Sequence, residues 1–369
     1  MTKTALKDFG EKKKRLRGYM QENGYGAAIL SRRDMFAWLS CGGDSKILRN
    51  TEIGVGAFLV TRDEIFLISE TMNIDFLMDD FLTGTDILPV PTKWHDPPEI
   101  AVAVKMAGNA AIVSDREHPG CEYKLHELQM LQFPLTDLEV ETCVENCGII
   151  NRMLKDIADY AKPGMTEREI EAEVIYGYTK NGFDCQVILI GSDWRISKYR
   201  HPIASGKAIE KTLLIHPASS RKGLFANITR MVSFGEPDRE TVRRYDAVCR
   251  LEAQTLSMTR PGVRLHSVLE KRKKLYADLG FAEEYENHYP GTVTGYFVAS
   301  ATPVSENERI MENQLLDWFI TITGVKTEEL TLSGGGGGIL LSSGADNPWP
   351  TEKYSYEENT YDLPAIYIR

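Results

Sequence analysis

The sequence predicts an α+β protein in which a smaller α/β domain precedes a larger domain made of two related halves. The main observation is an internal repeat. The stretch KPGMTEREIEAEVIYGYTKNGF, which starts at Lys162, shares its pattern with RPGVRLHSVLEKRKKLYADLGF, which starts at Arg260. The Pro-Gly, Tyr and Gly-Phe positions coincide in the two copies. Such a repeat indicates a domain of two similar units, and we expect its cleft on the axis that relates them.

Each copy predicts a helix followed by a strand. In the first copy, Thr166 and Glu169 have the spacing of a capping box at a helix start, and Asn181-Gly182 suits the helix end. The second copy keeps the turn and the stop but lacks the capping-box residues. We expect a strand-like apolar run after both copies, as in QVILIG from Gln186.

The apolar patterns predict the order of the other elements. Before the first copy we expect a helix over residues 4–22, a buried strand over 27–30 and a hairpin over 54–69. A short strand over 110–113 and a long amphipathic helix from near residue 138 should follow. Later we expect two strands over residues 212–215 and 228–235, and a helix over 238–258. A strand-rich segment over 288–332 and a mobile glycine hairpin turn at 334–338 should follow. We place the domain boundary after residue 136, so that 1–136 is the smaller domain and 137–369 the duplicated one.

Composition excludes several classes of partner. The net charge of −10 repels a polyanion, so we expect no nucleic acid partner. The first 20 residues are charged throughout and lack an apolar centre, which argues against a signal peptide or a membrane span. The six cysteines show no CxxC spacing, which is typical of reduced thiols. We therefore expect a cytoplasmic protein without a membrane partner.

Basic residues are concentrated in one segment of this acidic chain. Between Arg195 and Arg230 there are eight Lys or Arg residues and one acidic residue, Glu210. If the segment lines a cleft, it favours a small anionic ligand such as a carboxylate. The alternative is a solvated strand face, because runs of charge are commonly found there.

Three motifs occur in the order typical of one family. They read KPGMTEREI, NITRMVSFGEP and GVKTEEL. Together with the repeat, they resemble the creatinase/aminopeptidase superfamily (peptidase M24), and within it the creatinase and Xaa-Pro peptidase branch. The resemblance implies a pita-bread fold of two pseudo-symmetric helix-helix-strand halves for the C-terminal domain, preceded by a smaller creatinase-like α/β domain. It also implies a hydrolase similar to an Xaa-Pro aminopeptidase.

The resemblance indicates where two metal ions would bind. The peptidases of this fold hold them with Asp, Asp, His, Glu and Glu, because hard divalent cations require several carboxylate oxygens. The corresponding positions in this chain are His216, Asn227, Thr292, a position near Phe319, and Glu328. Only Glu328 matches, so we expect no metal ion and no other cofactor.

Creatinase lacks the metal and uses a histidine as acid and base. Its histidine falls in the region that reads YRHPIASG here, so the resemblance assigns this role to His201. An imidazole with a pKa of about 6.5 can take a proton from water and return it to a leaving nitrogen. The alternative is that His201 only caps a strand end. His288 resembles the first histidine of a motif found in a metal-poor branch of the family.

These considerations predict a metal-independent enzyme that acts on an amide, amidine or guanidino C–N bond of a small anionic, nitrogen-containing substrate. The catalytic candidates are His201 and Glu328, and the substrate-binding candidates are Arg195, Arg200, His216, Asn227, Arg230, His288 and Thr292. The alternatives are a non-catalytic pita-bread binding module, a lyase or cyclase on the same scaffold and, last, an ordinary metallopeptidase. We expect a homodimer, the assembly common in this branch.

Overall fold

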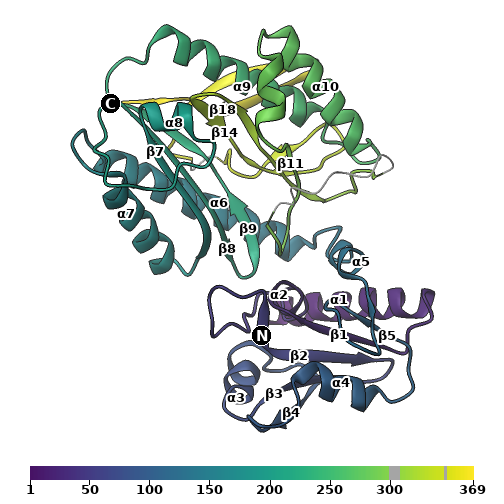
Figure 1. The fold of residues 1–369 in the computed structure, drawn as a ribbon. Coiled ribbons are helices and arrows are strands. Elements are labelled where there is room, and N and C mark those ends of the chain that lie inside the picture. The colour runs from purple at the N-terminus through teal and green to yellow at the C-terminus, as the bar shows by residue number, and fades with distance from the viewer. Residues whose placement is uncertain (299–307, 345–346) are drawn as a thin grey trace. The chain divides into compact units, whose positions relative to one another are not determined.

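The computed structural model describes residues 1–298, 308–344 and 347–369, and they form two compact units (Figure 1). The first unit contains Met1–Leu138 and Lys222–Leu224, and the second contains Glu139–Arg221 and Phe225–Arg369. Among these residues, no helix is both long and apolar enough to span a membrane. The domain boundary that the sequence predicts after residue 136 stays a prediction.

The first unit is a mixed six-stranded sheet with strand order β4-β3-β2-β1-β5-β6. Its strands are β1 (Ala27–Arg32), β2 (Ile53–Thr61), β3 (Ile65–Glu70), β4 (Ile87–Thr92), β5 (Ile112–Ser114) and β6 (Glu122–Tyr123). Its helices are α1 (Lys3–Glu22), α2 (Arg33–Leu39), α3 (Ile74–Phe76), the π-helical turn η1 (Leu77–Phe81), α4 (Glu99–Ala107) and α5 (Leu125–Met130). Strands β2 and β3 pair antiparallel, which confirms the predicted hairpin.

Helices cover both faces of this sheet, with α1 and α4 on opposite sides (Figure 1). Ile29 of β1 packs in one core cluster with Ile100 of α4, while on the other face Phe36 of α2 stacks on Phe58 of β2 with ring centroids 4.8 Å apart. A strand buried on both faces has no polar side to alternate with, which explains the continuous apolar run at β1.

The second unit contains the two related halves. Its helices are α6 (Asp137–Tyr160), α7 (Glu167–Lys180), α8 (Trp194–Lys198), α9 (Arg239–Met258), α10 (Leu265–Asp278) and the 3₁₀ turn η2 (Ala282–Asn287). The strands of the first half are β7 (Asp184–Ser192), β8 (Thr212–Arg221), β9 (Leu224–Asn227) and β10 (Arg230–Ser233). The later strands are β11 (Gly291–Val293), β12 (Leu315–Trp318), β13 (Ile320–Ile322), β14 (Val325–Thr327), β15 (Leu330–Leu332), β16 (Ile339–Leu340), β17 (Thr351–Tyr356), β18 (Asn359–Pro364) and β19 (Tyr367–Ile368).

The strands of the second unit form several small sheets. One has the order β19-β10-β8-β7 with β9 paired to β8, and a second has the order β11-β12-β15-β16; β13 pairs with β14, and β17 with β18. Helix α7 lies beside β7, and α9 lies beside β13 and β14 (Figure 1). Residues 334–338 connect the antiparallel pair β15 and β16, so the predicted glycine hairpin is confirmed.

The two sequence copies make the same backbone contacts. The amide of Gly164 donates to the carbonyl of Ile209 at 2.9 Å, and the amide of Gly262 donates to the carbonyl of Ile310 at 2.8 Å. Each turn is thus tied to a segment that lies 45 or more residues further along the chain, and in the same way. The duplication seen in sequence is therefore also a duplication of tertiary structure.

The helix ends in the two copies also agree. The amide of Phe183 donates to Tyr178 at 2.9 Å, and that of Phe281 donates to Tyr276 at 2.8 Å, across a glycine whose φ is 78° or 80°. This is the geometry of a glycine-stopped helix. The strand expected directly after the second copy is wrong, because the acidic segment that forms η2 comes first and β11 begins only at Gly291.

Candidate active site

Strand alternation places Lys326 and Glu328 on the same face, since they are two residues apart at β14. The Nζ atom of Lys326 lies 2.6 Å from Oε2 of Glu328, and both side chains are buried. His216 of β8 comes from the other half of the unit, and its Nδ1 lies 3.4 Å from the same Glu328 oxygen. These three side chains form a buried Lys-Glu-His cluster.

His216 is neutral in this cluster. Its Nδ1 lies 2.8 Å from the hydroxyl of Thr229, and Nζ of Lys326 lies 3.4 Å from each of the two ring nitrogens. Burial and the neighbouring ammonium hold the pKa of His216 well below its ordinary value. The positive charge of the cluster therefore belongs to Lys326.

A second carboxyl group, which the sequence argument missed, lies in the same site. Asp317 of β12 is fully buried and accepts a hydrogen bond from the side-chain amide of Asn227, and its carboxyl contacts that of Glu328. Burial and the Glu328 carboxylate raise the pKa of Asp317 well above its ordinary value, so it carries a proton that the two carboxyl groups can share. Asp317 lies two residues before Phe319 and thus on the same strand face, which was the signal available in the sequence.

Near one of the positions that correspond to metal ligands, Phe319 has a ring and no ligand atom. Phe319 presents its ring to Lys326, with Nζ 5.2 Å from the ring centroid. Thr292 lies in β11 opposite Asp317, but its side chain lies outside the described residues. Gly291 permits this close pairing, because a Cβ there would lie 2.2 Å from the carbonyl oxygen of Asp317.

His201 and His288 form a hydrogen-bonded pair. Their Nε2 atoms are 3.2 Å apart, and Nδ1 of His288 lies 2.7 Å from the carbonyl oxygen of Tyr289. A carbonyl only accepts, so Nδ1 of His288 carries the hydrogen. Burial and the charge of Lys326 lower the pKa of His288 to about 4, so this ring is neutral and its Nε2 accepts from His201.

This pairing fixes the tautomer of His201. If Nε2 of His201 donates to His288, the basic lone pair of a neutral His201 is on Nδ1. Burial and Lys326 lower the pKa of His201 as well. His201 is exposed, unlike His216, and it therefore has a basic nitrogen available at the surface of the site.

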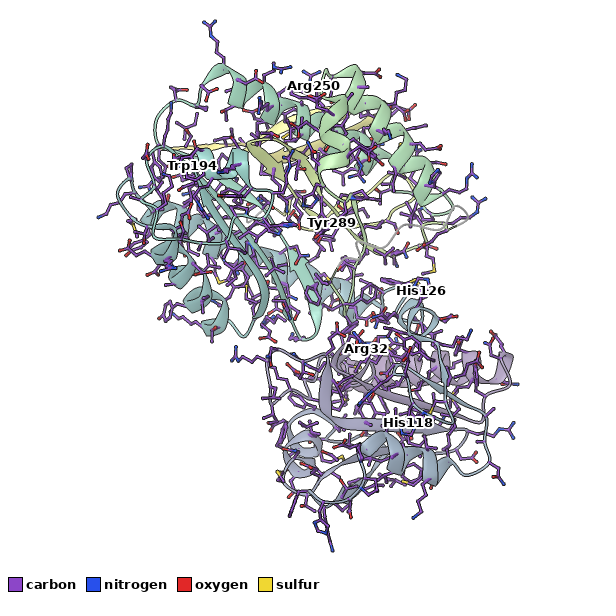
Figure 2. The ribbon with its side chains drawn as sticks, in the orientation of Figure 1. Arg32, His118, His126, Trp194, Arg250 and Tyr289 are labelled. Atoms are coloured by element: carbon purple, nitrogen blue, oxygen red, sulfur yellow. The ribbon has the colours of Figure 1, made fainter. Side chains whose placement is uncertain are left out.

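Aromatic rings connect the histidine pair to the Lys-Glu-His cluster. Tyr289, which is labelled in Figure 2, follows His288 in the sequence. Its ring centroid lies 6.1 Å from that of His201 and 5.5 Å from that of Phe319. Phe319 in turn lies against Lys326. The two groups of polar residues thus belong to one site.

The three arginine candidates are each paired with an acidic residue from another part of the chain. Arg195 contacts the buried carboxylate of Glu167 at 3.0 Å, and the guanidinium of Arg230, which is 1% exposed, pairs with Glu329. Arg200 pairs with Glu284 and also donates to the hydroxyl of Thr323 at 2.9 Å. A substrate carboxylate would have to compete with these partners, so their role as substrate ligands stays a prediction.

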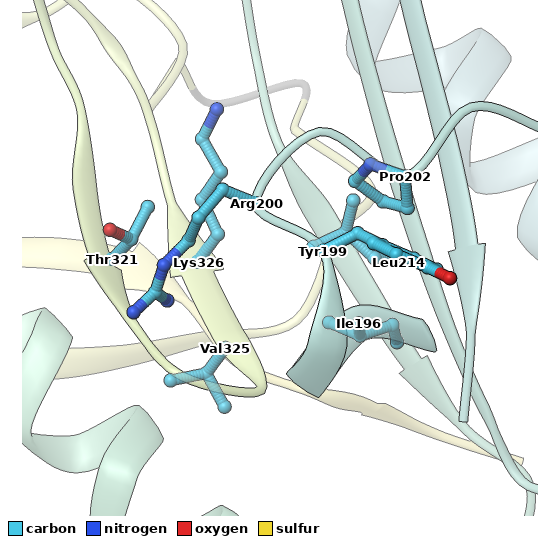
Figure 3. Close-up of a pocket in the computed structure, with 8 residues that line it drawn as sticks. All are labelled: Ile196, Tyr199, Arg200, Pro202, Leu214, Thr321, Val325 and Lys326. Atoms are coloured by element: carbon cyan, nitrogen blue, oxygen red, sulfur yellow. The ribbon is translucent and has the colours of Figure 1, made fainter. Parts of the chain in front are cut away.

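A small pocket is lined by Arg200 and Pro202, the residues on either side of His201 in the sequence. The pocket has a volume of about 20 Å³ for water, which is enough for one water molecule. A larger substrate would therefore lie across the mouth of the pocket. Arg200 and Lys326 form one side of it, and Pro202, Leu214 and Ile196 form the other (Figure 3). The remaining lining residues are Tyr199, Thr321 and Val325.

Close packing holds the loop that carries His201. Pro202 lies against Gly191 of β7, where a Cβ would come within 2.7 Å of the proline ring. The lack of a side chain at residue 191 therefore lets the His201 loop lie directly on the strand.

Comparison with known proteins identifies the class. Residues 142–316 match the model of metallopeptidase family M24. The match lies within the second unit, which therefore contains an M24-like segment and has the pita-bread fold.

Curated relatives are similar over less than half of their length. An uncharacterised peptidase of Staphylococcus saprophyticus is 24% identical over 155 residues, which cover 41% of this chain and 44% of the relative. A probable dipeptidase PepE of Mycobacterium tuberculosis is 21% identical over 161 residues, which cover 43% of each. These matches support the family and not a particular substrate.

Solved structures agree with the fold over nearly the whole chain. The prolidase from Pyrococcus horikoshii OT3 superposes with a TM-score of 0.74 at 18% identity, covering 90% of this chain and 98% of that one. The Xaa-Pro dipeptidase from Bacillus anthracis gives 0.73 at 16% identity, covering 98% and 100%. The N-terminal domain of the FACT complex subunit SPT16 from chickpea gives 0.66 at 10% identity, covering 92% and 98%.

The residues of this site do not fit the pair of metal ions that the family implies. Among the described residues, no group of three or more His, Cys, Asp or Glu side chains is arranged to hold a metal ion. At the corresponding positions an imidazole and an amide, His216 and Asn227, stand where the family has carboxylates. The carboxylate that does match, Glu328, is already paired with an ammonium.

Proposed function

We propose that this protein is a metal-independent member of the M24 family that hydrolyses an amide, amidine or guanidino C–N bond in a small carboxylate-bearing substrate. The observation that carries the proposal is the His201–His288 pair, together with a pocket that Lys326 and the sequence neighbours of His201 line. The similarity to a prolidase and to a probable dipeptidase supports a substrate of dipeptide size.

In this proposal His201 is the general acid and base. Its Nδ1 takes a proton from water as the water oxygen attacks the carbon of the C–N bond, and the same nitrogen then returns the proton to the leaving nitrogen. His288 accepts the hydrogen on Nε2 of His201 and so keeps the basic lone pair on Nδ1. The same proton transfers would serve a lyase or a cyclase, which remain alternatives on this scaffold.

The test is a hydrolysis screen of the full chain in the presence of a chelator. Dipeptides with and without proline and guanidino or amidino carboxylates are offered, and products are measured by mass spectrometry. We expect turnover of at least one class and a loss of about 100-fold or more in His201→Ala. His266→Ala is the matched control, because His266 is an exposed histidine on α10. Equal activity in His201→Ala and in the wild type would refute the role of His201.

A second candidate is a non-catalytic pita-bread module that binds a peptide. The replaced ligand positions and the pocket with room for about one water favour it, and the likeness to the SPT16 domain, part of a complex, is in keeping with it. Binding of dipeptides in calorimetry without any turnover, unchanged in His201→Ala, would select this candidate.

We further propose that the protein is a homodimer, as the family resemblance implies, and that it is cytoplasmic, as its composition predicts. Sedimentation at several concentrations tests the assembly, and a molar mass of one chain throughout would exclude the dimer.

A further inference from the structure

We infer that the ammonium of Lys326 takes the place that divalent metal ions have in the peptidases of this family. It is held by Glu328 and His216 and provides the cation that meets an oxygen of the substrate. The part that concerns substrate rests on the proposed function, whereas the replacement of the metal does not.

The position of Lys326 carries the inference. Its Nζ lies 2.6 Å from Glu328, the position that corresponds to a metal ligand, and 3.4 Å from both ring nitrogens of His216, another such position. The side chain is only 6% exposed and lines the pocket beside Arg200. One cation therefore connects two former ligand positions with the pocket.

The charges of the site are balanced without a metal ion. The ammonium of Lys326 pairs with Glu328 at 2.6 Å, and the carboxyl group of Asp317 accepts a hydrogen bond from the Asn227 amide. A divalent cation is recruited by several carboxylates, whereas here the carboxylate of Glu328 already has an ammonium as its counter-charge. A second cation at this place would also meet the repulsion of the first.

The residue type suits this role. Where the family motif has arginine, this chain has Lys326, and an ammonium is a compact point charge, whereas a guanidinium is a broad planar fork. An ammonium has three N–H donors. Glu328 and His216 account for two of them, which leaves the third for a carbonyl or carboxylate oxygen of the substrate.

The first experiment measures metal binding by the full chain. Protein dialysed against chelator is titrated calorimetrically with Mn²⁺, Co²⁺ and Zn²⁺, and wild type is compared with Glu328→Gln. We expect no stoichiometric binding that depends on Glu328. Binding of one or two ions per chain that disappears in Glu328→Gln would overturn the inference.

The second experiment is a double-mutant cycle of stability. Lys326→Met leaves a buried Glu328 carboxylate without its partner, so we expect a clear loss of thermal stability that is partly recovered in the Lys326→Met, Glu328→Gln double variant. Lys326→Arg keeps a cation and guards against a failure to fold, and Lys353→Met, on the exposed part of β17, is the surface control. Additive losses in the cycle would show that Lys326 only fills space and would overturn the inference.

Kinetics then separate this inference from the proposed function. If a substrate is found, Lys326→Met should lower kcat/KM at least tenfold, with Lys326→Arg between it and the wild type, and unchanged kinetics would remove Lys326 from substrate contact. If no substrate is hydrolysed, the proposed function fails, while the metal titration and the stability cycle still decide whether Lys326 replaces the metal.

Discussion

The two halves of the second unit share a backbone frame and differ in their buried charges. Glu167 at the start of α7 corresponds to Leu265 at the start of α10, and both are fully buried. Val174 within α7 corresponds to Arg272 within α10, and both are again buried. The repeat therefore conserves burial and helix geometry while exchanging apolar and charged side chains.

The buried charged side chains have similar structural roles in the two halves. The carboxylate of Glu167 accepts five hydrogen bonds, from Ser192, Arg195 and Ser205, and thereby holds the segment that carries His201. Arg272 donates to the carbonyl of Pro290 at 3.1 Å, close to His288. Each half thus uses one buried charged side chain on its repeat helix to hold the loop that contributes one histidine of the pair.

The largest expected effect comes from giving the first half the residue of the second. Glu167→Leu removes all five hydrogen bonds and leaves Arg195 unpaired, so we expect the free energy of unfolding to fall by about 3–5 kcal/mol in urea denaturation. The reciprocal Leu265→Glu buries a carboxylate without basic partners and should cost a similar amount. A change below about 1 kcal/mol in Glu167→Leu would contradict the role of this carboxylate.

The next effect comes from Arg272→Val, which copies the first half into the second. It leaves the carbonyl oxygens of Pro290 and Phe319 without their donor and removes the contact of the guanidinium with Trp318, whose ring lies 4.9 Å away. Two of the Arg272 nitrogens have no hydrogen-bond partner among the described residues. The valine variant no longer buries these nitrogens, which offsets part of the loss of stability. We expect a net loss of about 2–3 kcal/mol in urea denaturation. An unchanged or increased stability would show that the arginine does not hold this loop.

A smaller effect distinguishes the two histidines by pH. The folded-state pKa of His288 is about 4, below the value of about 6.5 in an unfolded chain. The stabilising contribution of the neutral ring is therefore complete above about pH 6.5 and is lost as pH falls towards 4, because the unfolded chain binds the proton first.

Because His288 is partly exposed, we discount this contribution to about 2 kcal/mol. His288→Asn should flatten the dependence of unfolding free energy on pH between 6.5 and 4, measured in urea, more than His201→Asn does. An identical slope in both variants would contradict the assigned difference in their environments.

The smallest effect concerns the helix caps of the two copies. Thr166 and Glu169 form the predicted capping box on α7, while Arg264 makes no side-chain cap on α10. We expect Thr166→Ala to lower the free energy of unfolding by about 1 kcal/mol and Arg264→Thr to raise it by a few tenths of a kcal/mol. Both changes are measured as shifts of the urea midpoint. A loss in Arg264→Thr would mean that the arginine has a role beyond the cap position.

Much of the fold follows from local patterns in the sequence. The capping box at Thr166, the glycine stops at Gly182 and Gly280, and the alternation at β2 and β3 are each decided by residues that are neighbours along the chain. The strand expected directly after the second copy was wrong, because the acidic residues that follow this copy have no apolar alternation and form η2.

The site could be predicted only in part. The family motifs pointed to His216, Asn227 and Glu328, which do lie together, but Asp317 and Lys326 were overlooked although strand alternation places each beside a recognised position. The ion pairs of Arg195 and Arg230 with acidic residues of other elements could not be read from the basic segment alone, and the role of these arginines as substrate ligands stays a prediction.

By itself, the sequence determined the duplicated architecture, because this depends on the order and type of residues. Only the tertiary structure decided which side chains meet. His201 and His288 are 87 residues apart and His216 and Lys326 are 110 apart, so their contacts depend on how the two halves pack and on strand register. Register and packing are set by the whole core, which is why the cation at the centre of this site was visible only in three dimensions.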